Sequence, residues 1–243
     1  MYYFLFSFKF FIENFGDDMN IIGDFKQPKK NITSTKKRKP SSTIWLKWQL
    51  NDPYVALAKQ KGYRCRACFK IMEIDEKFKL FKKGFKVLDL GSAPGGWSQV
   101  ITQKVGVDNV LAVDILEMQP LTGVKFIQQD FLAPEAEKRI LDQMDGKKYD
   151  VVVSDMAANT TGNKNIDHIR TSALVEGAYD FSVRILKPDG TFVAKVFQGG
   201  TEPDLFLRMR KDFKSVKHFK PNSSRKESVE IYVVAQGFKG LEV

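Results

Sequence analysis

The stretch VLDLGSAPGGWSQ, Val87 to Gln99, runs from an apolar strand through a glycine-rich turn into a helix. This order is typical of open α/β sheets, in which ligands bind at the carboxyl ends of the strands. Gly91, Gly95 and Gly96 allow the backbone to approach a ligand closely. The spacing is G-x-x-x-G-G with Pro94 inside it, not the G-x-G-x-x-G that places a pyrophosphate at a helix N-terminus. The turn therefore disfavours a dinucleotide.

Short apolar runs from Lys86 onward predict seven strands. Amphipathic stretches at Trp97 to Val105, Pro134 to Met144 and His168 to Leu186 separate the first five runs, which indicates repeated β-α-β units. The last two runs are joined by PNSSRKES, a loop that favours an antiparallel pair. We expect an α/β fold with a doubly wound, seven-stranded, mostly parallel sheet. The predicted strands are Val87 to Leu90, Val110 to Val113, Lys125 to Ile127, Val151 to Ser154, Thr191 to Val196, Val216 to Phe219 and Val229 to Ala235.

The segment before the sheet divides into a basic arm and a helical part. Residues 26–39, KQPKKNITSTKKRK, carry seven basic residues and no acidic one, which indicates a flexible arm over residues 1–40. From Trp45 to Leu80 the apolar spacing predicts two helices, punctuated by Asp52-Pro53 and Gly62. We therefore expect one domain over residues 41–243, with two helices at its N-terminus.

Composition restricts the class of partner and compartment. The formal net charge of +10 favours a polyanion such as nucleic acid, although charge alone leaves a membrane surface open. Met1 to Phe15 is aromatic-rich but lacks a basic start and a cleavage site, and it is shorter than the roughly 20 apolar residues of a membrane span. Cys65 and Cys68 exclude a disulfide framework and fit reduced thiols on a helix. A cytoplasmic protein is expected.

Three acidic residues lie at the carboxyl ends of successive predicted strands. Asp89 is placed to bind an amino-acid ammonium, Asp114 to accept two ribose hydroxyls, and Asp130, at the end of the third strand, to accept from the amine of adenine. Each carboxylate alone could be a helix cap or a turn residue. Together with the glycines they predict a pocket for a nucleoside that carries an amino acid.

Lys195 interrupts the apolar strand TFVAKVF. A buried ammonium is costly unless it is paired or deprotonated, and the neutral amine can act as a general base. The alternative is a strand-end lysine that reaches solvent. Asp155 follows the strand VVVS, and Glu230 alternates with apolar neighbours in SVEIYVV, so either could also be a cap or an exposed strand residue. Lys70 alone would be a solvated helix lysine.

Four motifs carry a resemblance to a known family. DLGSAPGGWSQV, SDMAANTTG, FVAKVFQG and PNSSRKESVEIYVVAQGFK are similar to the FtsJ (RrmJ) family of bacterial ribosomal RNA methyltransferases, over residues 41–239. The resemblance implies S-adenosylmethionine as cofactor and a Rossmann-like fold. It also implies cofactor contacts from Gly95, Trp97, Asp114, Asp130 and Asp155, and a catalytic tetrad of Lys70, Asp155, Lys195 and Glu230.

The resemblance implies 2′-O-methylation of a uridine in 23S rRNA within the 50S subunit. Lys195 would accept the proton, Asp155 and Glu230 would orient it and the hydroxyl, and Lys70 would position the ribose and favour the neutral form of its neighbour. The sequence departs from the family pattern at Cys68 and Ala158, which puts the stiffness of the loop beside the substrate in doubt. We expect RNA contacts from Lys36, Lys37, Arg38, Lys39, Arg64, Arg66, Arg225 and Lys226.

Several alternatives stay open at this point. A relative that methylates tRNA would share the tetrad, and a silent RNA-binding assembly factor would keep the basic arm but lose the tetrad. A dehydrogenase of the same fold would need the dinucleotide turn that is missing. His168 and His218 lie apart in the sequence, so we expect no metal site. A monomer is expected, because no apolar helix face is left over once the sheet is covered.

The first testable prediction concerns the start of translation. Met19 precedes a polar segment of ordinary character, so we expect synthesis to begin there and the preceding residues to be an artefact. Mass spectrometry of the N-terminal peptide from the native source checks this. A peptide that retains Met1 contradicts it.

Overall fold

The computed structural model of the 243-residue chain describes residues 49–158, 161–198 and 203–240. It divides into two compact units, Met1–Gly62 and Tyr63–Val243. The first unit holds α4 (Pro53–Gln60), where the Asp52 carboxylate accepts from the Tyr54 amide at 3.0 Å and caps the helix. The single domain expected over residues 41–243 stays a prediction.

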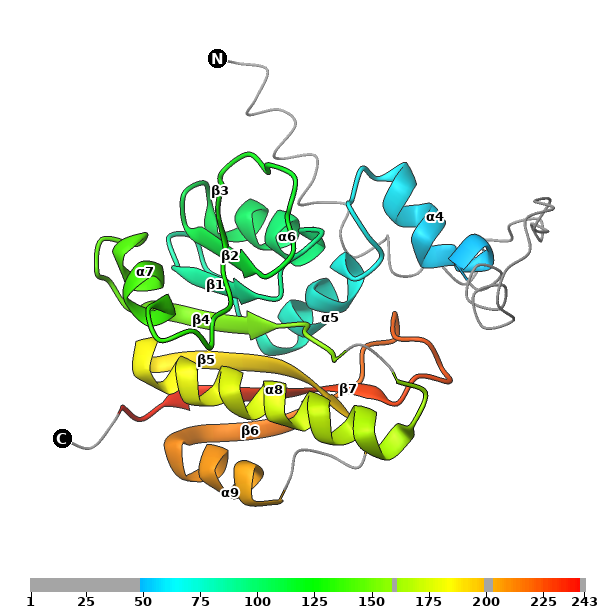
Figure 1. Cartoon of the computed structure of the whole chain (residues 1–243). Coiled ribbons are helices and arrows are strands. Elements are labelled where there is room, and N and C mark those ends of the chain that lie inside the picture. Colours follow the sequence, from blue (N-terminus) through cyan, green and yellow to red (C-terminus); the bar gives the residue numbers. More distant parts are fainter. Residues whose placement is uncertain (1–48, 159–160, 199–202, 241–243) are drawn as a thin grey trace, which may run out of the picture. The chain divides into compact units, whose positions relative to one another are not determined.

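The second unit is built on a seven-stranded sheet in the order β3-β2-β1-β4-β5-β7-β6 (Figure 1). The first five strands run parallel, and β7 pairs antiparallel with both β5 and β6. The α/β fold and the antiparallel pairing of the last two strands are therefore confirmed. The strands are β1 (Val87–Leu90), β2 (Val110–Asp114), β3 (Val124–Gln128), β4 (Tyr149–Ser154), β5 (Leu186–Phe197), β6 (Phe213–Phe219) and β7 (Glu230–Phe238).

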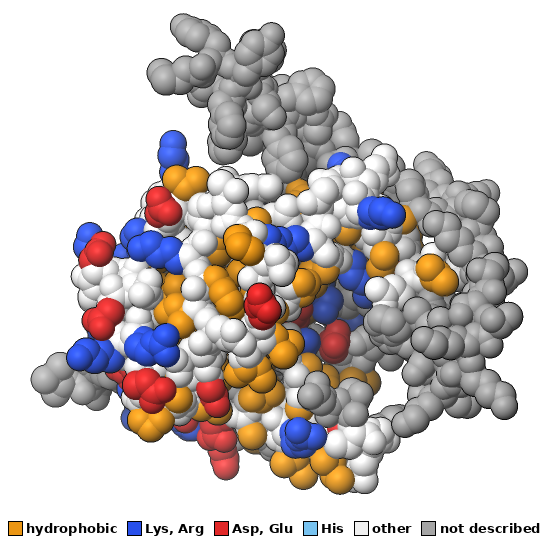
Figure 2. Space-filling model, turned by 45° about the horizontal axis from the view of Figure 1, so that its top comes forward, with side chains coloured by type: hydrophobic (Ala, Val, Ile, Leu, Met, Phe, Trp, Pro, Cys, Tyr) orange, Lys and Arg blue, Asp and Glu red, His pale blue; other side chains and the backbone are white. Residues whose placement is uncertain are grey.

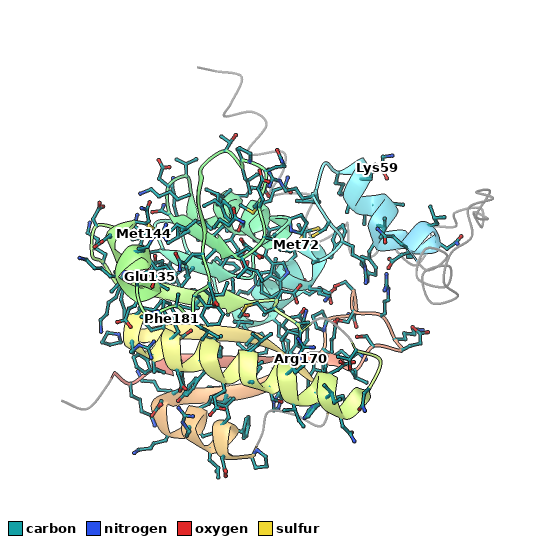
Figure 3. All side chains as sticks on the ribbon, viewed as in Figure 1. Lys59, Met72, Glu135, Met144, Arg170 and Phe181 are labelled. Atoms are coloured by element: carbon teal, nitrogen blue, oxygen red, sulfur yellow. The ribbon has the colours of Figure 1, made fainter. Side chains whose placement is uncertain are left out.

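Helices cover both faces of this sheet. Residues of α7 (Ala136–Asp142), α8 (Lys164–Ile185) and α9 (Pro203–Asp212) share one apolar core with the sheet, in which Met144 and Phe181 take part (Figure 3). The other face carries α5 (Cys68–Phe78) and α6 (Gly96–Val105), which contact each other. Because β1 is covered on both sides, all four of its residues are buried, and three of them are apolar, with Asp89 as the exception.

The structure corrects several sequence-based boundaries. Helix α9 was missed, because only Leu205 and Met209 of it are buried, and the exposed Leu207 stands among charged residues. Strand β5 begins at Leu186, before the predicted start, through an irregular stretch where its pairing register with β4 shifts. Strand β3 ends at Gln128, so Asp130 lies in the following loop and does not end the strand. Helix α8 starts at residue 164, because the Asn163 side chain caps it.

One finding bears on membranes. Among the residues that the structure describes, no helix has both the length and the apolar character required to span a bilayer.

The shared core predicts the cost of removing a central ring. Phe192 of β5 is fully buried in this core, whereas Leu207 of α9 is 63% exposed. We expect Phe192→Ala to lower the free energy of unfolding by about 3–5 kcal/mol and Leu207→Ala by less than about 0.5 kcal/mol. Denaturant unfolding of both variants checks this. Similar losses in the two variants would contradict the assigned core.

Candidate active site

The glycines in the turn between β1 and α6 let other groups approach the backbone closely. Gly91 has a φ of +74°, and a Cβ there would lie 2.1 Å from Cγ of Met156. Gly95 has a φ of +100°, and a Cβ there would lie 2.9 Å from Nη1 of Arg64. Both positions therefore favour glycine by conformation, and at Gly91 the Met156 side chain also leaves no space for a Cβ. Met156 directly follows Asp155, so the turn lies beside the residues that leave β4.

Arg64 forms hydrogen bonds with two loops that follow β1 and β2. Its guanidinium donates to the carbonyl of Pro94 at 3.0 Å, of Gln119 at 2.7 Å and of Pro120 at 2.5 Å. These carbonyls belong to the β1–α6 turn and to the loop between β2 and β3. These donors join the two loops, and the RNA-binding role that the sequence analysis gave to Arg64 stays a prediction.

The acids predicted to hold a nucleoside lie at the carboxyl edge of the sheet. The Asp114 carboxylate accepts from the amides of Ala93 and Leu116, each at 2.8 Å. The Asp130 carboxylate accepts from the Leu132 amide at 2.9 Å. Leu116 and Leu132 are exposed apolar side chains, and apolar and charged groups interleave on the face that Figure 2 displays. Acids next to exposed apolar residues suit the polar edge and flat face of a nucleoside.

Asp89 differs from this prediction. Its side chain is buried, and its carboxylate accepts from the Ser98 hydroxyl at 2.6 Å. Burial raises the pKa of Asp89 from 3.8 to about 7, although the bond from Ser98 opposes that shift. The structure thus uses this carboxyl to join β1 to α6, and its contact with an amino-acid ammonium stays a prediction.

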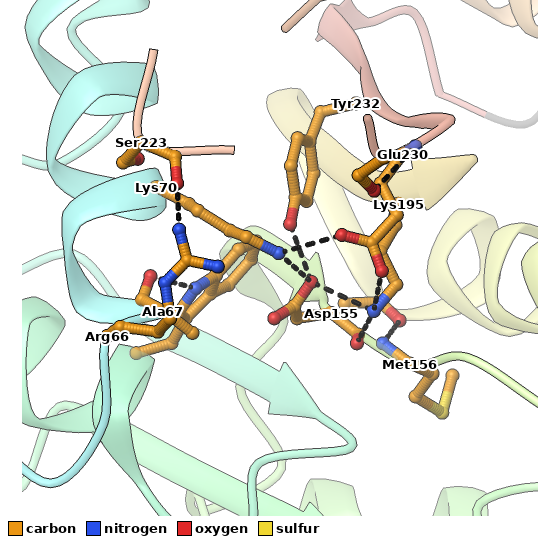
Figure 4. Close-up of polar contacts among 12 residues, drawn as sticks. Arg66, Ala67, Lys70, Asp155, Met156, Lys195, Ser223, Glu230 and Tyr232 are labelled. Carbon is orange, nitrogen blue, oxygen red and sulfur yellow. Dashed lines mark hydrogen bonds and ion pairs between the residues drawn. The ribbon is translucent and has the colours of Figure 1, made fainter. Parts of the chain in front are cut away.

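The four predicted catalytic residues converge from α5, β5, β7 and the residue that follows β4 (Figure 4). The Lys195 ammonium lies 3.2 Å from the Asp155 carboxylate and 3.9 Å from Glu230, and it donates to the Asp155 carbonyl at 2.6 Å. The Lys70 ammonium lies 3.2 Å from Glu230 and 3.9 Å from Asp155. Each lysine therefore has both carboxylates as neighbours, and the structure brings together all four side chains.

The charges in this tetrad stabilise one another. Burial alone would raise the pKa of Asp155, but the Lys195 and Lys70 charges outweigh it and lower that pKa below its usual value. The pKa of Glu230 is likewise lowered, because the same two lysines outweigh the effect of burial. Both carboxylates are therefore ionised at neutral pH and act as acceptors for the lysines.

Tyr232 is part of this site, although the sequence analysis did not single it out. Its hydroxyl donates to the Asp155 carboxylate at 2.6 Å, and its ring lies 5.6 Å from that of Trp97. Burial and the Asp155 charge raise the pKa of Tyr232 well above its usual value, so the hydroxyl stays a donor. The alternation of β7 could have revealed it, because Tyr232 stands two residues after Glu230 and faces the same side.

The remaining predicted RNA contacts fall into three groups. Arg66 donates to the Ser223 carbonyl and so reaches the loop between β6 and β7, residues 220–229. Arg225 and Lys226 lie in that same β6–β7 loop. The basic arm with Lys36, Lys37, Arg38 and Lys39, together with Met19, lies outside the described residues. The RNA-binding role of all these residues stays a prediction.

The cysteines and histidines lie in other settings. Cys65 and Cys68 are free thiols, and Cys68 opens α5 while Cys65 stands in the turn before it. The ring of His168 lies 6.2 Å from that of Phe197, and His218 stacks on a phenylalanine of α9. Within residues 49–158, 161–198 and 203–240, no three histidine, cysteine or acidic side chains are grouped as metal ligands.

Comparison with known proteins identifies the class. The FtsJ-like methyltransferase model matches residues 63–238, so the chain belongs to that family. The ribosomal RNA large subunit methyltransferase E of Azorhizobium caulinodans is 51% identical over 221 residues, 89% of this chain and 92% of the relative. The protein of that name from Rickettsia akari is 49% identical over 222 residues, 89% of this chain and 97% of the relative. A crystal structure of a ribosomal RNA methyltransferase from Plasmodium falciparum has a TM-score of 0.65 and 29% identity, covering 74% of this chain and 100% of that one.

The raised pKa of Asp89 predicts a pH dependence of stability. The pKa of Asp89 is about 7 in the folded protein, above the ordinary 3.8. The protonated carboxyl is therefore compatible with the fold below about pH 4, whereas between about pH 4 and pH 7 the ionisation of this group favours the unfolded state and lowers the free energy of unfolding. Asp89→Asn keeps an acceptor for Ser98 and removes this ionisation. We compare the melting temperature of the variant with that of the unmutated protein at each pH. We expect this difference, variant minus unmutated protein, to be larger at pH 8 than at pH 5 by about 4 °C or more. A difference that does not change with pH would contradict the assignment.

Proposed function

We propose that this protein transfers the methyl group of S-adenosylmethionine to the 2′-hydroxyl of a uridine in 23S rRNA, with Lys195 as the general base. The observation that carries the proposal is the proximity of the glycine turn to the residue that follows Asp155 of the tetrad. Gly91 packs on Met156, the residue after Asp155, so a ligand held by the turn would lie beside the two lysines. The family and the names of its ribosomal RNA relatives support the same reaction.

The residues of the turn fit the proposed cofactor. Ser92 has a buried hydroxyl with no hydrogen-bond partner among the described residues, and it stands inside the glycine turn. The Asp114 carboxylate would take the ribose hydroxyls, Asp130 the adenine amine, and Trp97 would line the amino-acid end. S-adenosylmethionine supplies a methyl group on a positively charged sulfur, which makes it an electrophile. The exposed Leu132 offers an apolar surface for the adenine ring.

The tetrad fits the proton chemistry of the acceptor. A ribose hydroxyl is a weak acid, so the reaction requires a base that removes its proton as the new bond forms. The neutral amine of Lys195 would accept that proton, and the resulting ammonium is stabilised by Asp155 at 3.2 Å. Lys70 lies 3.2 Å from Glu230, where the two side chains would orient the hydroxyl. The alignment of the two reactants supplies most of the rate.

RNA is the acceptor that the charge of the chain favours. The net charge of +10 and the basic Arg225 and Lys226 of the β6–β7 loop suit a phosphate backbone. Because side chains cannot read the deep groove of A-form RNA, we expect the target uridine in an exposed loop. The proposal places this uridine in the 50S subunit, treats the enzyme as a cytoplasmic monomer, and retains tRNA as the alternative substrate.

Removal of the proposed base tests the reaction. We expect Lys195→Ala to reduce methyl transfer to undermethylated 50S subunits by about 10²-fold or more, while S-adenosylmethionine still binds. Lys187→Ala is the matched control, because Lys187 lies on the same strand but pairs with Asp150 at 2.8 Å. Labelled cofactor, nuclease digestion and mass spectrometry identify the product as 2′-O-methyluridine.

Each other outcome contradicts a separate part of the proposal. Label on tRNA but not on rRNA would favour the tRNA relative, and no label on any RNA would favour a silent assembly factor. Full activity of the Lys195 variant would remove Lys195 as the base. A methyl group on a nucleobase would exclude ribose chemistry.

A further inference from the structure

Glu73 is a buried acid that the proposed reaction does not use. It lies on α5, and its side chain is among the buried charged groups at 3% exposure. One carboxylate oxygen accepts from the Asn222 amide at 2.6 Å, and the other accepts from the Ser223 amide at 2.8 Å. A single carboxylate thus binds two consecutive amides of the β6–β7 loop, across 149 residues of sequence.

Two further contacts join this region to α5 and to the turn before it. Lys70 stands three residues before Glu73 on α5, so both lie on one side of the helix, whereas Arg66 lies in the turn that precedes Cys68. Arg66 donates to the Ser223 carbonyl, and Lys70 binds Glu230 at 3.2 Å. The three side chains therefore join α5 and the turn before it to the β6–β7 loop and to the start of β7.

The β6–β7 loop leads directly into the tetrad. Ser223 is fully buried, and the Lys220 ammonium donates to the Ser228 carbonyl at 2.8 Å, which closes the loop on itself. The Ser228 hydroxyl in turn accepts from the Glu230 amide at 3.2 Å. A shift of the loop at Asn222 would consequently be passed on to the backbone of Glu230.

We infer that Glu73 is a positioning residue for the reaction, which holds the β6–β7 loop so that Glu230 stays in the tetrad. The inference rests on the proposed function for its effect on methyl transfer. The loop also carries Arg225 and Lys226, so the same two hydrogen bonds fix these cations relative to Lys70. Glu73 acts through the loop and needs no contact with either reactant.

The test compares two buried acids of the same helix. In Glu73→Gln the side-chain NH2 group replaces one acceptor and faces a backbone N–H, so one of the two bonds is lost. Asp75→Asn is the matched control, because Asp75 is also buried on α5 but accepts from Phe81 at 3.0 Å and pairs with Lys104 at 3.2 Å. The full-length proteins are compared at a temperature where all are folded, by methyl transfer, cofactor binding and hydrogen exchange.

We expect Glu73→Gln to lower kcat on RNA by about 10- to 100-fold, with the dissociation constant of S-adenosylmethionine within about twofold of the unmutated value. Hydrogen exchange in residues 221–228 should accelerate in this variant, whereas Asp75→Asn leaves both kcat and exchange in that loop unchanged. Equal losses of kcat in the two variants, or unchanged loop exchange in Glu73→Gln, overturn the inference. If the unmutated protein methylates no RNA, the proposed function fails, and the exchange measurement still decides whether Glu73 holds the loop.

Discussion

The need to compensate two buried ammonium groups determines how the elements around the site are arranged. Lys195 and Lys70 are 6% and 7% exposed, and a buried cation without a counter-charge is strongly destabilising. The compensating carboxylates, Asp155 and Glu230, come from β4 and β7. No element can therefore shift by a residue without leaving a charge unpaired, so α5 and three strands are fixed relative to one another.

The sheet supplies the register that this pairing requires. Lys195 of β5 stands opposite Tyr232 of β7, and Phe197 stands opposite Glu230. Because β5 pairs with β4 on its other side, the three strands that carry tetrad residues are adjacent. Hydrogen bonds of the backbone thus set the spacing of the acids and the base, and the side chains then complete the pairing. The rigid strands explain how flexible lysines are held at fixed positions.

The sequence predicted the strands well where apolar runs were short and bounded by turns, as at Val87 to Leu90, which β1 matches. It failed at α9, whose apolar side is narrow, and at the start of β5, where Lys187 to Gly190 resembles a turn. Polar residues within an irregular strand give no periodic signal. Here the pairing partner decides the structure, and local propensity does not.

The four residues that the resemblance assigned to a catalytic tetrad lie close to one another in the structure. Lys70 alone looked like a solvated lysine, yet the structure buries it against Glu230. The contacts of Arg64 and Glu73 could not be foreseen, because their partners are backbone groups far away in sequence. Almost every residue has a backbone amide and a carbonyl, so the residue types in a sequence do not indicate which of these groups a distant side chain binds.

The position of β7 in the sheet has a consequence for how the chain folds. This strand is synthesised after the other six, yet it lies between β5 and β6 and not at the edge of the sheet. Strand β6 pairs only with β7, so it cannot join the sheet until residues 230–238 have been made. Glu230 and Tyr232 belong to the same strand, so the sheet and the set of charges in the site both stay incomplete without it. Completion of the fold and completion of the site thus depend on one segment.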